Sequence, residues 1–131
     1  MSDDIIYSAI IDEHYQEPRN FGKIENPDEQ IMETNPTCGD TIAMYVRIND
    51  GRVSDIKYVA KGCLISVAAA SILSENVEGK RIEEIETMSK KDVLGNLGLE
   101  LGPAREKCAL LSYDALMKMI RDYKGKSEER T

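Results

Sequence analysis

The sequence contains no tryptophan and a single phenylalanine, so the core of this 131-residue chain has to be built mainly from aliphatic side chains. Hydrophobic residues make up 41% of the chain, which is enough for one packed core in a domain of this length. The sequence also lacks a run of the roughly 20 apolar residues that a membrane-spanning helix needs. Its first ten residues, "MSDDIIYSAI", carry acids where a secretory signal carries basic residues, so we expect a cytoplasmic protein.

Positive charge is also in deficit. The chain has 17 Lys and Arg residues against 24 Asp and Glu residues, which gives a formal net charge of -7. Nucleic acids and anionic membranes bind positively charged surfaces, so we expect neither of them as the main partner.

Cysteine and histidine are scarce. The three cysteines are Cys38, Cys63 and Cys108, an odd number that does not favour a disulfide framework. The chain has no C-x-x-C pair, which excludes zinc ribbons and thioredoxin-like motifs. Spacing alone leaves three interpretations open: buried inert residues, reactive thiols and metal ligands. We interpret the one histidine, His14, as a surface or capping residue near the end of a helix.

The first half of the chain predicts one helix followed by a small antiparallel sheet. Residues 3–16 form the expected helix, with acids in its first turn where the helix dipole favours them. Pro, Gly and Asn mark a loop over residues 17–30. Apolar and polar residues then alternate in three segments that we predict as strands: 30–34, 41–48 and 52–60. The "NDG" at residues 49–51 is typical of a tight hairpin turn.

The second half of the chain predicts helices. Residues 63–79 are apolar nearly all round, which is typical of a buried helix. Residues 81–98 read as short helical pieces, with Ser89 as a cap, and Pro103 suits the first turn of a last helix. We expect a polar, frayed tail over residues 124–131. The predicted fold class is therefore α+β, a three-stranded antiparallel sheet with helices mainly on one face, in a single domain over 1–131 whose core spans about 4–122.

Each cysteine falls at a predicted structural boundary. Cys38 precedes a strand, Cys63 lies at the start of the buried helix, and Cys108 lies in the first turns of the last helix. A helix N-terminus favours the thiolate form of a cysteine, and thiolates bind soft metals and iron–sulfur clusters. The glycine between Cys38 and Asp40 gives the backbone the freedom to turn both side chains inward. A plain turn at Gly39 and Asp40 explains the same residues equally well.

Four segments, in order, resemble the iron–sulfur cluster scaffold proteins of the IscU, SufU and NifU N-terminal type. They are "YSAIIDEHYQEPRNFG", "NPTCGD", "GCLISVAAASIL" and "REKCALLSYDAL". The resemblance extends over residues 4–122. The family has an α+β fold with a three-stranded antiparallel sheet, which agrees with the elements predicted above.

The resemblance implies a scaffold or carrier protein and not an enzyme. A cysteine desulfurase that uses pyridoxal phosphate would deliver persulfide sulfur, iron would join it, and the resulting [2Fe-2S] cluster would pass to recipient apoproteins. By position, the implied metal ligands are Cys38, Asp40, Cys63 and Cys108, and Cys108 is the implied sulfur acceptor. Zn²⁺ in the cluster-free form and a homodimer that shares a cluster are compatible with the same residues.

The sequence departs from the family's branches in three places. Lys107 stands directly before the third cysteine, where the IscU branch has histidine, and the continuation "CALLSYDAL" is closer to the SufU branch. The SufU insertion between the second and third cysteines does not fit in residues 64–107. The run "LGPAR" replaces the Leu-Pro-Pro-Val-Lys segment that a chaperone recognises in the IscU branch, so chaperone dependence does not follow from the resemblance.

These departures leave alternatives open. Lys107 is either a surface lysine or a charge that favours the thiolate of Cys108. A zinc-bound sulfur acceptor for a desulfurase, as in the SufU branch, is the alternative function. A thiol enzyme would need a base beside its nucleophile, and His14 is distant in sequence from every cysteine.

Overall fold

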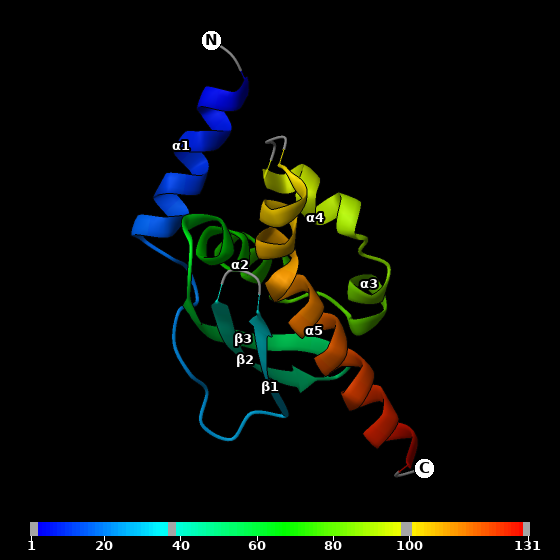
Figure 1. Ribbon diagram of the computed structural model, residues 1–131. Helices are drawn as coiled ribbons and strands as arrows, with labels where there is room; N and C mark the ends of the chain where they lie inside the picture. The colour runs from blue at the N-terminus through cyan, green and yellow to red at the C-terminus, as the bar shows by residue number, and fades with distance from the viewer. Residues whose placement is uncertain (1–2, 37–38, 98–100, 130–131) are drawn as a thin grey trace.

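The computed structural model describes residues 3–36, 39–97 and 101–129, and the side chains of 9–36, 39–97 and 101–126. Within these residues the chain forms three strands and five helices in the following order: α1 (Asp3–Gln16), β1 (Glu29–Asn35), β2 (Asp40–Asn49), β3 (Arg52–Lys61), α2 (Leu64–Val77), α3 (Ile82–Glu86), α4 (Lys90–Leu97) and α5 (Pro103–Glu129). Figure 1 shows the sheet as one layer and α2 to α5 stacked over one side of it, with α1 against α2. The predicted α+β class is thus confirmed.

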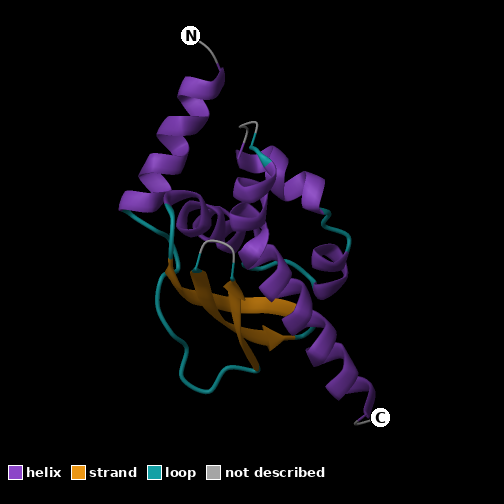
Figure 2. Ribbon diagram, in the orientation of Figure 1, coloured by secondary structure: helices purple, strands orange, loops and turns teal. Residues whose placement is uncertain are grey.

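The three strands form an antiparallel sheet, as the sequence predicts, and their order within it is β1-β2-β3 (Figure 2). Met44 in the middle strand lies opposite Ile31 on one side and Tyr58 on the other. The hairpin between β2 and β3 turns at Asp50 and Gly51, whose φ angles are 52° and 74°. Two successive positive φ angles are what a tight two-residue hairpin requires, and Asp-Gly adopts them at little cost.

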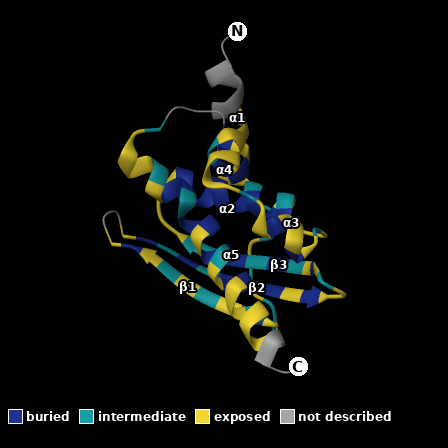
Figure 3. Cartoon of the chain, turned by 90° about the vertical axis from the view of Figure 1, so that its right-hand side faces the viewer, coloured by how far each residue is buried: buried dark blue, intermediate teal, exposed yellow. Residues whose placement is uncertain are grey.

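The main core lies between the inner face of the sheet and the helices α2 and α5. The alternate residues of β2 point into this core, in agreement with the predicted two-residue period. They are Ile42, Met44, Val46 and Ile48. Helix α2 supplies small and aliphatic side chains such as Ala70 and Leu73, and α5 supplies Leu116 and Met119. Figure 3 shows α2 almost wholly buried between the sheet and its neighbouring helices, as expected for a helix that is apolar nearly all round.

A second buried cluster joins the C-terminal half of α1, the N-terminal half of α2, the end of α4 and the first turns of α5. Its members are Ile11, Ile65, Ala68, Ala69, Leu97, Cys108 and Ala109. Because Cys108 belongs to this cluster, the start of α5 is fixed by packing against α2. The described helices include none that is long and apolar enough to cross a lipid bilayer.

Two details of the helices refine the sequence interpretation. The predicted cap at Ser89 is confirmed, because the Ser89 hydroxyl accepts the N–H of Asp92 and the Asp92 carboxylate accepts the N–H of Ser89. The frayed tail expected from residue 124 is wrong as far as residue 129, because α5 continues to Glu129. Lys124 and Lys126 hold this part of the helix in place by pairing with Glu86 and Glu29, each at 2.9 Å.

The expectation that His14 is a surface or capping residue is also wrong. The His14 side chain is only 8% exposed, and its Nδ1 lies 2.6 Å from the Ser71 hydroxyl of α2. Its Nε2 lies 3.6 Å from a carboxylate oxygen of Glu75. Burial, followed by the nearby charge of Arg19, lowers the pKa of His14, which outweighs the opposing effect of Glu75. His14 is therefore part of the junction that attaches α1 to α2.

Candidate metal centre

Three of the four ligands implied by the sequence come together where the sheet meets the helices. Asp40 is the first residue of β2, Cys63 directly precedes α2, and Cys108 lies in the second turn of α5. One carboxylate oxygen and the two sulfur atoms all lie within 4.8 Å of one another. Asp40 and Cys108 are buried, whereas Cys63 is exposed. The fourth residue, Cys38, lies outside the described residues.

The local backbone explains how the chain positions Asp40 and Cys63. Gly39 has a φ angle of 74°, and a side chain there would meet nothing within 4 Å. Its role is therefore to supply a left-handed backbone conformation just before β2, as the sequence suggested. Cys63 occupies the N-cap position of α2 with extended backbone angles, which confirms the prediction that it lies at a helix N-terminus. Its thiol thus lies at the positive end of the helix dipole.

The Asp40 carboxylate is enclosed by hydrogen-bond donors. Its Oδ1 accepts the backbone N–H of Cys63 at 3.0 Å. Its Oδ2 accepts the hydroxyl of Ser66 and lies 3.5 Å from the Cys63 sulfur. Asp40 is 2% exposed. A buried carboxylate would be costly without such donors, and these bonds, with the α2 dipole, stabilise its charged form at the place where a cation would bind.

Gly62 is a site residue that the sequence analysis did not single out. Its φ angle is 153°, and a Cβ atom at this position would lie 2.2 Å from Oδ1 of Asp40. Real structures essentially never show so short a contact, so any other residue at position 62 would displace the carboxylate. The signal available in the sequence was the "GC" pair, which is informative only once Asp40 is known to lie against it.

Asn35 and Ser66 are two more residues that sequence reasoning missed. The Asn35 side chain donates from Nδ2 to the sulfur of Cys108 over 3.9 Å, and both residues are buried. Ser66 is 4% exposed and contacts Asp40, Cys63 and Cys108. Neither residue type is distinctive in sequence. Only the packing of β1 against α5 and of α2 against β2 gives them a place beside the thiols.

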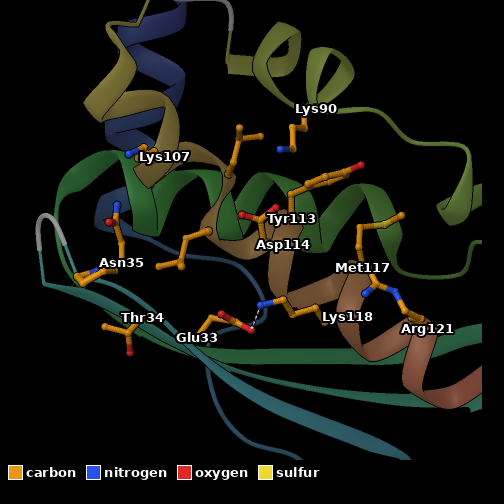
Figure 4. A pocket seen from close by; sticks show the side chains of 13 residues that line it. Glu33, Thr34, Asn35, Lys90, Lys107, Tyr113, Asp114, Met117, Lys118 and Arg121 are labelled. Carbon is orange, nitrogen blue, oxygen red and sulfur yellow. Dashed lines mark hydrogen bonds and ion pairs between the residues drawn. The ribbon is translucent and has the colours of Figure 1, made fainter.

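Lys107 lies outside the donor group, in an open groove beside it (Figure 4). The groove has a volume of about 640 Å³ and runs between the end of β1, α4 and α5. Four basic and two acidic side chains line it: Lys90, Lys107, Lys118, Arg121, Glu33 and Asp114. Lys118 pairs with Glu33 at 2.7 Å. The exposed position of Lys107 is that of a surface lysine at the edge of the groove, next in sequence to the buried Cys108.

The donor set suits a thiophilic metal. Two cysteine sulfurs and one carboxylate oxygen, all within 4.8 Å of one another, are of the ligand types that Zn²⁺ and iron in clusters accept. Gly62 keeps the space beside the carboxylate clear. The only histidine of the chain is bound to Ser71 and Glu75 instead, so the described residues do not form the thiol–imidazole pair of a cysteine enzyme.

Comparison with known proteins identifies relatives of this chain. Residues 6–130 match the model of the family described as NifU-like N terminal domain. The iron–sulfur cluster assembly scaffold protein IscU of Escherichia coli (strain K12) is 34% identical over 128 residues, which cover 95% of this chain and 98% of that protein. IscU 1 of Archaeoglobus fulgidus is 38% identical over 118 residues, which cover 90% of this chain and 76% of that protein.

The same fold is found in a solved structure. The crystal structure of a NifU-like protein (N-terminal) from Brucella abortus superposes with a TM-score of 0.77 at 23% identity, covering 95% of this chain and 97% of that one. The match to the family model extends over nearly all of the chain, including Asp40, Cys63 and Cys108. The chain therefore belongs to the NifU-like N-terminal domain family.

Proposed function

We propose that this protein is a scaffold on which a [2Fe-2S] cluster is assembled from iron and persulfide sulfur, and from which the cluster passes to apoproteins. The observation that carries the proposal is the convergence of Asp40, Cys63 and Cys108, whose donor atoms lie within 4.8 Å of one another. The relatives in Escherichia coli and Archaeoglobus fulgidus are named as iron–sulfur cluster assembly scaffold proteins, which supports the same role. The cluster is cargo that the protein builds and releases, so the protein acts as a carrier and not as an enzyme.

In this proposal the three described ligands have different tasks because their exposure differs. The exposed Cys63 gives incoming iron and a recipient protein access to the cluster. The buried Cys108 is the sulfur acceptor: its thiolate attacks the outer sulfur of the donor's persulfide, a new S–S bond forms, and the donor's cysteine leaves as a thiolate. The Asn35 N–H that points at the Cys108 sulfur would stabilise that attacking thiolate. Cys38 is proposed as the fourth ligand.

Asp40 is proposed as the ligand that lets the cluster leave. A carboxylate is a harder donor than a thiolate and binds cluster iron less strongly. When the iron departs, the carboxylate keeps its hydrogen bonds to the Cys63 N–H and the Ser66 hydroxyl. Release therefore does not leave an unpaired buried charge, which would otherwise oppose it.

The alternative function is a zinc-bound sulfur acceptor. The same residues can hold Zn²⁺ tetrahedrally, with Asp40 or Cys108 free to exchange. Lys107 in place of a histidine before Cys108 favours this alternative, because a charged lysine is a poor ligand.

We further propose a cytoplasmic cysteine desulfurase and apo iron–sulfur proteins as partners. One cluster could be held by each chain or shared in a homodimer, since Cys63 is exposed at the edge of the site.

Anaerobic reconstitution with Fe²⁺, cysteine and a cysteine desulfurase tests the proposal. We expect visible charge-transfer bands, with near-equal iron and acid-labile sulfide, and their loss in each of Cys38→Ser, Cys63→Ser and Cys108→Ser. The ratio of iron to protein then distinguishes a cluster per chain from a shared one. If the protein instead retains zinc, carries a persulfide on Cys108 and forms no cluster, the sulfur-acceptor function would replace the scaffold function. Absence of both cluster and persulfide would overturn both functions.

A further inference from the structure

Ser66 lies at the centre of the candidate metal centre without belonging to the ligand set. It is in the first turn of α2, and its hydroxyl oxygen lies 3.6 Å from the Cys63 sulfur and 3.4 Å from the backbone oxygen of Cys108. Its shortest contact is to Oδ2 of Asp40. At 4% exposure the hydroxyl is shielded from solvent. One side chain therefore touches three of the residues proposed to hold the metal.

The contacts of Ser66 decide where its single proton goes. A hydroxyl has one proton, so it cannot be donated both to Asp40 and to the Cys108 carbonyl. The Asp40 oxygen is the closer of the two acceptors, and a carboxylate oxygen is a stronger hydrogen-bond acceptor than a backbone carbonyl. The proton is therefore directed at Asp40, and the hydroxyl oxygen remains an acceptor toward the Cys63 thiol.

The Asp40 carboxylate is confined from the other side as well. The Cys63 N–H holds Oδ1 at 3.0 Å, and the backbone of Gly62 lies so close that a Cβ atom would collide with that oxygen. On the other carboxylate oxygen, Oδ2, the Ser66 hydroxyl is a side-chain donor that a substitution can remove, and it lies closer to Oδ2 than the Cys63 sulfur, which is 3.5 Å away. Without its hydroxyl the carboxylate would lose one of the bonds that orient it between the two sulfur atoms.

We infer that Ser66 is a positioning residue, which orients the Asp40 carboxylate toward Cys63 and Cys108 before a metal arrives. Partners of this kind, which bind a ligand and not the metal, commonly change metal affinity when they are removed. The inference deepens the proposed function and rests on it, because it requires Asp40, Cys63 and Cys108 to be metal ligands. In this inference Ser66 affects metal binding only by orienting Asp40.

The test measures binding of Co²⁺ and Zn²⁺ to the metal-free protein by competition with a chromophoric chelator. We expect Ser66→Ala to weaken binding by roughly tenfold, the lower end for such residues. Ser66→Thr, which keeps the hydroxyl, should bind like the wild type, and Ser66→Val, which has the shape of threonine without the hydroxyl, should bind like Ser66→Ala. The Thr and Val pair decides the question if the alanine variant fails to fold.

A matched control is Ser112→Ala. Ser112 is also a buried helix serine, at 1% exposure, and its hydroxyl has no hydrogen-bond partner among the described residues. Its removal should leave metal affinity unchanged. A second control repeats Ser66→Ala in an Asp40→Ala background, where it should have no further effect on affinity, because a residue that acts through another gives non-additive changes.

The possible outcomes distinguish a failure of this inference from a failure of the proposed function. If the wild type shows no sulfur-to-cobalt charge-transfer band, or if the band keeps its full intensity in Cys63→Ser, the metal centre itself is wrong. If the wild type binds cobalt through Cys63 but Ser66→Ala and Ser66→Val bind equally well, only the role of Ser66 is overturned. An equal loss in the Asp40→Ala background would also overturn it, since Ser66 would then act independently of the carboxylate.

Discussion

Two groups of buried polar side chains lie along helix α2, and the two groups differ in how accessible they are from solvent. At its N-terminus, Asp40 is buried but the neighbouring Cys63 thiol is exposed. About two turns further along the helix, Ser71 lies between His14 and the backbone N–H of Arg19, at 2.6 and 2.9 Å. This second group, the His14 junction, pairs its polar atoms with one another.

The comparison shows what distinguishes a binding site from a structural polar cluster in the same helix. Both groups contain a buried ionisable residue and a buried serine. At the His14 junction the partners come from α1, α2 and the loop after α1, and they fix one helix against the other. At the metal centre, soft donor atoms face one another within 4.8 Å, an arrangement suited to hold a cation.

The largest expected effect is that of Cys63→Ser. Because the side chain of Cys63 is exposed, its loss should leave the thermal stability of the metal-free protein close to that of the wild type. Cluster reconstitution, measured by iron and acid-labile sulfide, should fall to background. If Cys63→Ser still assembled a full cluster, Cys63 would not be a required ligand. The proposed difference between a binding site at the metal centre and a structural cluster at the His14 junction would then be contradicted.

Gly62→Ala should impair both stability and metal binding. The added Cβ atom would collide with Oδ1 of Asp40, and the φ angle of 153° is unfavourable for alanine. We expect a loss of about 1–3 kcal/mol in the free energy of unfolding, as for other strained backbones, together with weaker Co²⁺ binding. Gly95→Ala in α4 is the control, because a side chain there meets nothing within 4 Å and alanine favours helix, so stability should rise. Equal metal binding in Gly62→Ala and the wild type would contradict the proposal that Gly62 leaves room for the Asp40 carboxylate.

Asp40→Ala is expected to slow the release of an assembled cluster several-fold. The weaker, harder ligand is removed, and the thiolates retain the cluster. The measurement is the rate at which cluster-loaded ferredoxin forms after addition of an apo-ferredoxin acceptor, compared with the wild type at equal loading. This kinetic effect is compatible with weaker equilibrium binding of a single Co²⁺ ion, in which Asp40 is one of few ligands. Release at the wild-type rate would remove Asp40 from its proposed role as the exchangeable ligand.

His14→Ala should act in the opposite way to Cys63→Ser. The hydrogen bond to Ser71 is lost in a buried place, which we expect to cost about 1–3 kcal/mol in the free energy of unfolding. Co²⁺ binding to the folded protein should not change. A loss of metal binding in a variant whose fold is intact by circular dichroism would show that the two groups on α2 are coupled.

The smallest expected effect is a dependence of the free energy of unfolding on pH, which originates at the His14 junction. Burial lowers the pKa of His14 below its ordinary value of 6.5, so the folded state binds a proton less readily than the unfolded chain. The stability that neutral His14 contributes is present above pH 6.5 and is lost as the pH falls through the lowered folded-state value. The free energy of unfolding, measured with urea at pH 7.5 and at acid pH, should fall less for His14→Ala than for the wild type as the pH is lowered. An identical decline in both proteins would assign the pH dependence to other groups.

Local signals in the sequence were sufficient for most of the fold. The alternation around Met44, the Asp50-Gly51 turn, the apolar run of α2 and the cap at Ser89 each depend on a few neighbouring residues, and all are confirmed. The extension of α5 to Glu129 was missed because Lys126 gains its ion pair from Glu29, a residue 97 positions away.

The sequence by itself determined the α+β class and the order of the elements, because periodicity and turn residues are properties of short segments, and the resemblance of four such segments to a known family supplied the candidate ligands. Only the tertiary structure decided that Gly62 must lack a side chain, that Ser66 reaches Asp40, and that His14 is buried against Ser71. Each of these depends on two elements that meet across 22 residues or more of chain, and no local pattern encodes the distance between them.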